Sequence, residues 1–294
     1  MSRSLLRNRI ELTTYLLLRS LFRVLPLRLA DGLGRRTGLL YRLVDGRRRR
    51  LVARNLALAF PEKSPAEVDR LSREVFAHFG GLAADLFRSE TERVEKLLER
   101  IEIVGLEHAR AVAASGRAAF FSSPHLGNWE WAALATGASG IVVTIVARPL
   151  DNPLLHARLT AMREKTGCRV VSKRDAARTL LKTLRGGGLV GILADQRARP
   201  PDGIAVPFFG RPALTTTSVA RLAARTDALI LPAVCLRTAP GRYRLTYSEP
   251  LDVAKLPPEE REVERLTARI TALVESQVRA APEQWLWLHD RWRS

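Results

Sequence analysis

The clearest candidate for chemistry is His125, which precedes Glu130 by five positions in the stretch PHLGNWE. A histidine whose second ring nitrogen is held by a carboxylate can deprotonate a hydroxyl for attack on an acyl or phosphoryl group. In one continuous helix the two side chains would point about 140° apart. They can meet only if His125 lies in a turn and Glu130 in the first turn of the helix that follows. Pro124 and Gly127 favour that turn, so the sequence permits a His–Glu general-base pair.

The same stretch also fits a purely structural interpretation. Asn128 can cap the helix, and the negative charge of Glu130 can stabilise the positive N-terminal end of the helix dipole. His125 would then only line the turn. The spacing alone leaves both interpretations open. Ser122 and Ser123 come just before, but neither a G-x-S-x-G elbow nor an S-x-x-K motif occurs, so a covalent serine mechanism is not expected.

Alternating strand and helix patterns must position these residues. Strand patterns cover residues 117–123, 140–147, 168–172, 189–195, 229–237 and 243–249. Helix patterns cover residues 128–136, 152–166, 174–185, 215–226 and 257–280. This alternation predicts an α/β fold: a single domain with a central, mostly parallel mixed sheet flanked by helices.

Polar residues gather where three of these strands end. Arg148 and Asn152 follow the second strand, and Asp195 ends the fourth, directly before Gln196 and Arg197. Ligands in such sheets bind beyond the carboxyl ends of the strands. We therefore expect these loops to meet the His125 loop, since a base, a carboxylate and an arginine at one sheet edge form the usual layout of an active site.

The N-terminal segment is strongly basic and amphipathic. The chain has a net charge of +18, and residues 1–60 hold fourteen arginines and no lysine against three carboxylates. The uncharged run before Arg19 has only seven residues, whereas a membrane span needs about 20. A secretory signal peptide is not expected either, because arginines interrupt the apolar region that it would need. The pattern favours a helical region lying in a membrane surface, with an ordinary packed helix and a general enrichment in arginine as alternatives.

Two regions follow from these patterns: residues 1–60, a basic amphipathic membrane-associating helical region, and residues 61–294, the α/β domain. The first helix of the second region has clear start signals, because Ser64 can cap it, Pro65 suits its first position and Glu67 completes a capping box.

Other kinds of site find little support. Cys168 and Cys235 lie in separate apolar stretches, which suits core residues better than a disulfide or a zinc site. No P-loop and no cluster with metal-ligand spacing occurs. GLGRRTG at 32–38 has nucleotide-loop spacing but no preceding strand, so it is expected to form a turn.

Six stretches, in order along nearly the whole chain, resemble the bacterial lipid A biosynthesis late acyltransferase family, of the lauroyl and myristoyl acyltransferase type, within the glycerolipid/lysophospholipid acyltransferase superfamily. They are RNLALAFPEKS, PHLGNWEWA, RPLDNPLLHARLTAMREKTG, LADQ, VPFFGRPALTTTSVARLAARTDA and PEQWLWLHDRW. GNWE is also similar to the phosphatidylinositol mannoside acyltransferase branch, which leaves the acceptor glycolipid open.

The resemblance implies an acyltransferase that moves a fatty acyl chain from acyl carrier protein or acyl-CoA to a hydroxyl of a lipid-linked sugar, such as a lipid A precursor. His125 would be the general base and Glu130 the carboxylate that orients it. Arg148 is a candidate for binding phosphate or stabilising the oxyanion. The expected substrate-binding residues are Asn128, Arg148, Asn152, Asp195, Gln196 and Arg197.

The implied partners are the acidic acyl carrier protein, an anionic glycolipid acceptor and the cytoplasmic face of the inner membrane, with peripheral or monotopic attachment. The acyl thioester is a co-substrate, and neither a bound cofactor nor a metal is expected. A basic protein that binds nucleic acid or membrane without chemistry is the main alternative. It is disfavoured because the five tryptophans fall within two of the motifs and are not interleaved with the arginines. A hydrolase using the same residues on water is a further alternative.

Overall fold

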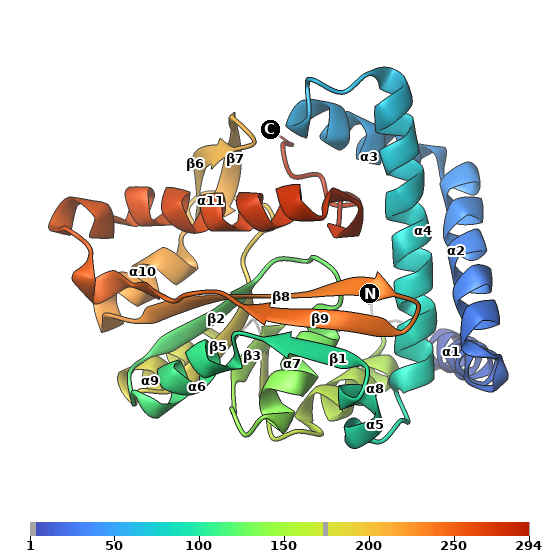
Figure 1. Ribbon diagram of the computed structural model, residues 1–294, viewed down its shortest axis with the longest axis horizontal. Helices are drawn as coiled ribbons and strands as arrows, with labels where there is room; N and C mark the ends of the chain where they lie inside the picture. The colour runs from blue at the N-terminus through green and yellow to red at the C-terminus, as the bar shows by residue number, and fades with distance from the viewer. Residues whose placement is uncertain (1–3, 173–175, 294) are drawn as a thin grey trace.

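The computed structural model describes residues 4–172 and 176–293. An eight-stranded sheet runs in the order β1-β9-β8-β2-β5-β3-β4, with β10 paired to β8 (Figure 1). Its strands are β1 (Ile101–Val104), β2 (Ala119–Ser123), β3 (Thr144–Ala147), β4 (Arg169–Ser172), β5 (Leu189–Leu193), β8 (Leu229–Ala239), β9 (Arg242–Tyr247) and β10 (Leu251–Asp252). Within this sheet, as far as the described residues show it, only the pairings of β8 with β9 and with β10 are antiparallel. The predicted α/β class with a mostly parallel mixed sheet is confirmed.

Helices cover both faces of this sheet. One layer contains α6 (Leu106–Ala114), α7 (Trp129–Ala138) and α8 (Pro153–Glu164), and the other contains α9 (Ala176–Arg185), α10 (Ser218–Thr226) and α11 (Val263–Ala280). The short α5 (Val94–Leu98) packs at the edge of the first layer. Alternation along β2 explains the two layers: Phe121 packs in the cluster of α7, and Phe120 packs in the cluster of α10 and α11. The buried runs read from the sequence are therefore strands with core on both sides.

Four longer helices precede α5 and the sheet: α1 (Leu5–Val24), α2 (Leu27–Val44), α3 (Gly46–Ala59) and α4 (Pro65–Ser89). The predicted capping box at the start of α4 is present, with Ser64 and Glu67 bonded reciprocally. The predicted turn at 32–38 is wrong, because this segment is part of α2. Its glycines let α2 lie against α4 along the right of Figure 1: a Cβ at Gly38 would come 2.0 Å from the Phe76 carbonyl oxygen.

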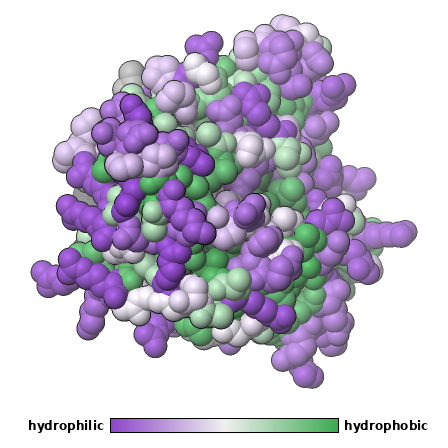
Figure 2. All heavy atoms as spheres, turned by 60° about the vertical axis from the view of Figure 1, so that its left-hand side comes forward, coloured by the Kyte–Doolittle hydropathy of each residue, from purple (hydrophilic) through white to green (hydrophobic). Residues whose placement is uncertain are grey.

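Apolar side chains on α1 and α2 face outward. Fourteen of the seventeen exposed large hydrophobic residues of the described chain lie on these two helices. Figure 2 turns the opposite side of the molecule toward the viewer, where hydrophilic side chains project over much of the surface. Among the described residues, no helix combines the length and hydropathy needed to cross a membrane.

A hairpin of β6 (Gly203–Phe208) and β7 (Arg211–Thr216) replaces the start of one predicted helix, and α10 begins only at Ser218. Pro207 and Pro212 face each other in this hairpin. Proline is unusual in strands except at edges. The two prolines therefore gave no indication of strands here, and the two-stranded hairpin was not predicted. The helix predicted from residue 257 also begins later than expected. Residues 258–261 form a 3₁₀ turn, and α11 starts at Val263. The remaining 3₁₀ turns are η1 (Val253–Lys255) and η3 (Pro282–Gln284).

Candidate active site

The turn between β2 and α7 holds His125 outside the helix, as the sequence predicted. Gly127 adopts φ +61°, and a Cβ there would lie 2.1 Å from the carbonyl oxygen of Cys235, so only glycine fits. The turn is fixed to its surroundings by backbone bonds: Asn128 N donates to Cys235 O at 2.8 Å, and Leu286 N donates to His125 O at 3.0 Å. Strand β8 and the carboxyl-terminal segment thus set the position of the histidine.

The carboxylate that contacts the His125 ring belongs to Asp195. Parallel pairing of β2 with β5 aligns Ser123 with Leu193, so the residues that follow the two strands meet at one sheet edge. His125 Nδ1 lies 2.6 Å from Asp195 Oδ1, and the His125 backbone N–H donates to Asp195 Oδ2 at 2.8 Å. Trp285 Nε1 donates to the same Oδ2 at 2.7 Å. An ionised carboxylate only accepts, so this network assigns the Nδ1–H tautomer and leaves the lone pair on Nε2.

The charges of this pair shift both pKa values. Burial by itself lowers the pKa of His125, but the charge and hydrogen bond of Asp195, together with the charge of Glu130, raise it above its ordinary value. Burial alone would raise the pKa of Asp195, yet the hydrogen bonds from His125 and Trp285 and the charge of the ring lower it. Asp195 is therefore ionised at neutral pH, and His125 is a stronger base than a free imidazole.

The free nitrogen of His125 faces a position that a substrate can reach. The ring keeps 18% of its side-chain surface exposed, against 1% for Asp195. Gln196 Nε2 lies 3.4 Å from His125 Nε2, at the limit of hydrogen bonding, and the Trp129 ring packs edge-on against the imidazole. A hydroxyl could displace so weak a contact and bond Nε2 directly.

Glu130 does not bond the ring, in contrast to the sequence-based expectation. Arg163 Nε donates to Glu130 Oε2 at 2.8 Å and Arg163 Nη2 to Glu130 Oε1 at 2.5 Å, while Trp129 Nε1 donates to Oε1 at 3.2 Å. Glu130 is in the first turn of α7, as expected, but there it faces the helix α8 that carries Arg163. It acts on His125 through its charge and not through a hydrogen bond.

The profile of the family described as bacterial lipid A biosynthesis acyltransferase matches residues 3–294. The chain belongs to this family. It is similar to the lipid A biosynthesis lauroyltransferase of Escherichia coli K12, with 30% identity over 91% of this chain and 85% of that protein. It is also similar to the phosphatidylinositol mannoside acyltransferase of Mycobacterium tuberculosis, with 28% identity over 81% of this chain and 75% of that protein.

A solved structure overlaps more loosely. The 1-acyl-sn-glycerophosphate acyltransferase of Thermotoga maritima gives a TM-score of 0.43 at 15% identity, covering 89% of this chain and all of that one. The membership of the family, together with its acyltransferase relatives, makes the chain an acyltransferase.

Among the other predicted site residues of this acyltransferase, Asn128 and Asn152 cap helices, whereas Arg148 is exposed. Asn128 caps α7 by accepting from Trp131 N, and so supports the turn. Arg148 is exposed just beyond the end of β3. Asn152 is buried and caps α8, and its amide nitrogen donates to Asn8 O and to a Glu11 oxygen.

In the loop after β5, one predicted residue contacts His125 and the next contacts the carboxyl-terminal segment. Gln196 lies beside His125 Nε2, whereas the Arg197 backbone N–H donates to His289 Nε2 at 3.0 Å. The structure therefore brings His125, Asp195 and Gln196 together, whereas Asn152 ties α8 to α1.

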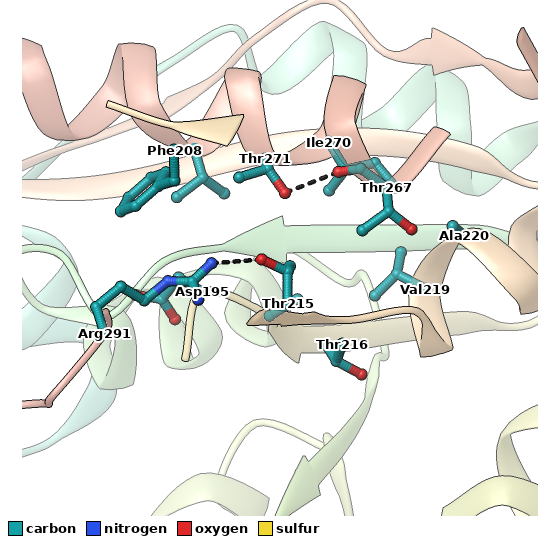
Figure 3. A pocket seen from close by; sticks show the side chains of 12 residues that line it. Asp195, Phe208, Thr215, Thr216, Val219, Ala220, Thr267, Ile270, Thr271 and Arg291 are labelled. Carbon is teal, nitrogen blue, oxygen red and sulfur yellow. Dashed lines mark hydrogen bonds between the residues drawn. The ribbon is translucent and has the colours of Figure 1, made fainter. Parts of the chain in front are cut away.

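Behind Asp195 lies only a small internal cavity of about 10 Å³ (Figure 3). Arg291 extends beside Asp195 there, and its Nη2 donates to Thr215 Oγ1 at 2.5 Å. Burial lowers the pKa of Arg291 to about 10. The cavity is too small for a substrate group, since even one water needs about this much room.

Sequence reasoning missed two residues of this site. Arg163 lies in the block RPLDNPLLHARLTAMREKTG, and Trp285 lies in the carboxyl-terminal block PEQWLWLHDRW. Both blocks carried the family resemblance, yet neither residue follows a strand end. Only the packing of α8 and of the carboxyl-terminal segment against the His125 turn reveals them.

Proposed function

We propose that the protein is a membrane-associated O-acyltransferase that moves a fatty acyl chain from acyl carrier protein, or acyl-CoA, to a hydroxyl of a lipid-linked sugar. The acceptor proposed first is a lipid A precursor. The observation that carries the proposal is His125, whose partly exposed ring is made basic by Asp195 at Nδ1 and has only a 3.4 Å contact with Gln196 at Nε2. Membership of a lipid A acyltransferase family supports the choice of acceptor.

In the proposed reaction, the acceptor hydroxyl donates its hydrogen bond to His125 Nε2. The ring takes the proton as the oxygen attacks the thioester carbonyl carbon, and Asp195 stabilises the imidazolium that forms. The tetrahedral intermediate expels the thiolate, which takes the proton from His125. An ester and a free thiol result, with no acyl-enzyme.

Glu130 has a supporting role in this proposal. Its charge stabilises the imidazolium, and its bidentate bond to Arg163 fixes α7 against α8. Arg148, exposed at the same sheet edge, remains the proposed contact for a substrate phosphate or the oxyanion.

Membrane attachment is supported by the outward-facing apolar side chains of α1 and α2, which alternate with arginines. Such a surface suits insertion into the headgroup region of an anionic leaflet, here the cytoplasmic face of the inner membrane. The exposed arginines also suit an acidic carrier protein as the donor.

The test is mass spectrometry of membrane lipids from cells with the wild-type protein, without it, or with His125→Ala. An added acyl mass on a sugar lipid that requires His125 supports the proposal and names both the acyl chain and the acceptor. His125→Ala with near wild-type turnover would refute it.

The phosphatidylinositol mannoside acyltransferase relatives make a mannosylated lipid the second candidate acceptor. The same spectra separate the two, because the mass shift appears on a different lipid. Consumption of the thioester without any acylated lipid would instead indicate a hydrolase.

A further inference from the structure

A groove of about 570 Å³ lies between α3 and the carboxyl-terminal segment. Helix α3 supplies four arginines to its lining: Arg47, Arg48, Arg50 and Arg54. Arg48 Nη1 donates to Leu288 O at 2.7 Å, and Arg54 pairs with Asp290. These bonds hold α3 beside the carboxyl-terminal segment and keep the groove in shape.

The opposite side adds Arg197, Arg199 and Arg293, and Asp290 is the single carboxylate among the lining residues. Within residues 4–172 and 176–293, Arg54 is the only groove arginine that forms an ion pair. Arg197 Nε is buried without a hydrogen-bond partner. So many unneutralised arginines around one cavity repel each other unless an anion binds between them.

The groove lies near the reacting histidine, since the charges of Asp195 and His125 both act on the lining residue His289. The Arg197 backbone N–H bonds His289, and Arg197 directly follows Gln196, whose side chain lies 3.4 Å from His125 Nε2. A ligand held by the arginines would therefore lie close to His125.

The groove also begins where the apolar surface of α2 ends. Leu43 and Val44 are 65% and 77% exposed, and Arg47 follows only three residues later. An anion in the groove would thus sit at the level of the headgroups when α2 lies in a membrane.

We propose that this groove binds the phosphate groups of the acceptor lipid and so selects a phosphorylated glycolipid. The inference rests on the proposed acyl transfer and specifies its substrate class. Arginine forms bidentate bonds to phosphate. The volume falls in the range of roughly 300–1,000 Å³ that is typical of small-ligand sites, which favours a headgroup over the surface of a carrier protein.

The test compares Arg47→Gln/Arg50→Gln with the control Arg110→Gln/Arg225→Gln. All four arginines are exposed, and both pairs remove the same charge. Acyl transfer from acyl carrier protein is measured in nonionic detergent micelles. The acceptor is an acylated glucosamine disaccharide that carries phosphate monoesters, or the same lipid after phosphatase treatment.

The groove variant should raise the acceptor KM by about tenfold, the loss expected for two arginine–phosphate bonds at a solvated site. Its kcat and its donor KM should be unchanged. Phosphatase treatment should raise the KM of the wild type and abolish the difference between variant and wild type. The control should match the wild type with both acceptors.

An equal effect on the dephosphorylated acceptor, or a rise in the donor KM alone, would overturn the proposal, and the latter would assign the groove to the carrier. Binding of the phosphorylated lipid to His125→Ala, titrated in the same micelles, separates this inference from the proposed reaction. Binding that depends on Arg47 and Arg50 supports the groove even if no acyl transfer occurs. Binding that does not depend on them refutes the groove even if the enzyme is active.

Discussion

Replacing Asp195 with asparagine should disable the general base while keeping the shape of the site. Asp195 accepts three hydrogen bonds, from His125 Nδ1, from the His125 backbone N–H and from Trp285 Nε1. An amide nitrogen at the Oδ2 position would face two donors, whereas at the Oδ1 position it faces only Nδ1. The second arrangement has less conflict, but it forces the proton onto Nε2 and removes the lone pair needed for catalysis.

The expected loss follows from two contributions. The charge-assisted bond to the imidazolium is worth about 3 kcal/mol, and the wrong tautomer adds about 1–2 kcal/mol, in line with the larger effect known for the equivalent change in Ser-His-Asp triads. Together they predict a fall in kcat of about 10³-fold or more.

The pH profile gives an independent readout. The base must be neutral, so activity rises with pH through the pKa of His125, which Asp195 holds above its ordinary value. In Asp195→Asn the lowering effect of burial prevails, and the acid limb of residual kcat/KM should move to lower pH.

The assay is steady-state acyl transfer in mixed micelles across the neutral range. The control is Asp252→Asn, which removes a carboxylate bonded to Arg117 at the opposite end of the sheet. It should remain as active as the wild type. Activity of Asp195→Asn within tenfold of wild type, with an unmoved acid limb, would refute the assigned role.

Three further substitutions test the surroundings of the site. Trp285→Phe keeps the packing but removes one charge-assisted bond to Asp195, so kcat should fall about tenfold, and an unchanged kcat would show that this bond does not matter. Gly127→Ala must strain a φ of +61° and push against the Cys235 carbonyl, so urea unfolding should show a loss of about 2–3 kcal/mol, which an unaltered midpoint would contradict. Arg163→Gln leaves its buried carboxylate partner unpaired and should cost about 3 kcal/mol in the same assay, partly restored when that carboxylate is also changed to glutamine. Equal stability of the single and double variants would argue against the pair.

Much of the architecture could be predicted because it depends on local patterns. Buried runs bounded by turns predicted strands at the correct places, and Ser64 predicted the start of α4. The turn predicted at 32–38 was wrong, because the glycines there let α2 pack against α4 and do not end the helix. The β6–β7 hairpin was missed, because its paired prolines are unusual in strands.

The sequence by itself determined that His125 precedes a helix, that Gly127 forms the turn before it and that Asn128 caps it, since these depend on backbone preferences within a few residues. The tertiary structure decided which carboxylate meets the ring. Asp195 is 70 residues away from His125 along the chain and reaches it only because β5 pairs with β2.

The same tertiary packing turned Glu130 toward another helix, although it is only five residues from His125. The first turn of α7 faces α8, and Arg163 is there to pair with the carboxylate. Spacing limits which residues can approach each other, but the order of strands in the sheet and the direction of each helix decide which of them do.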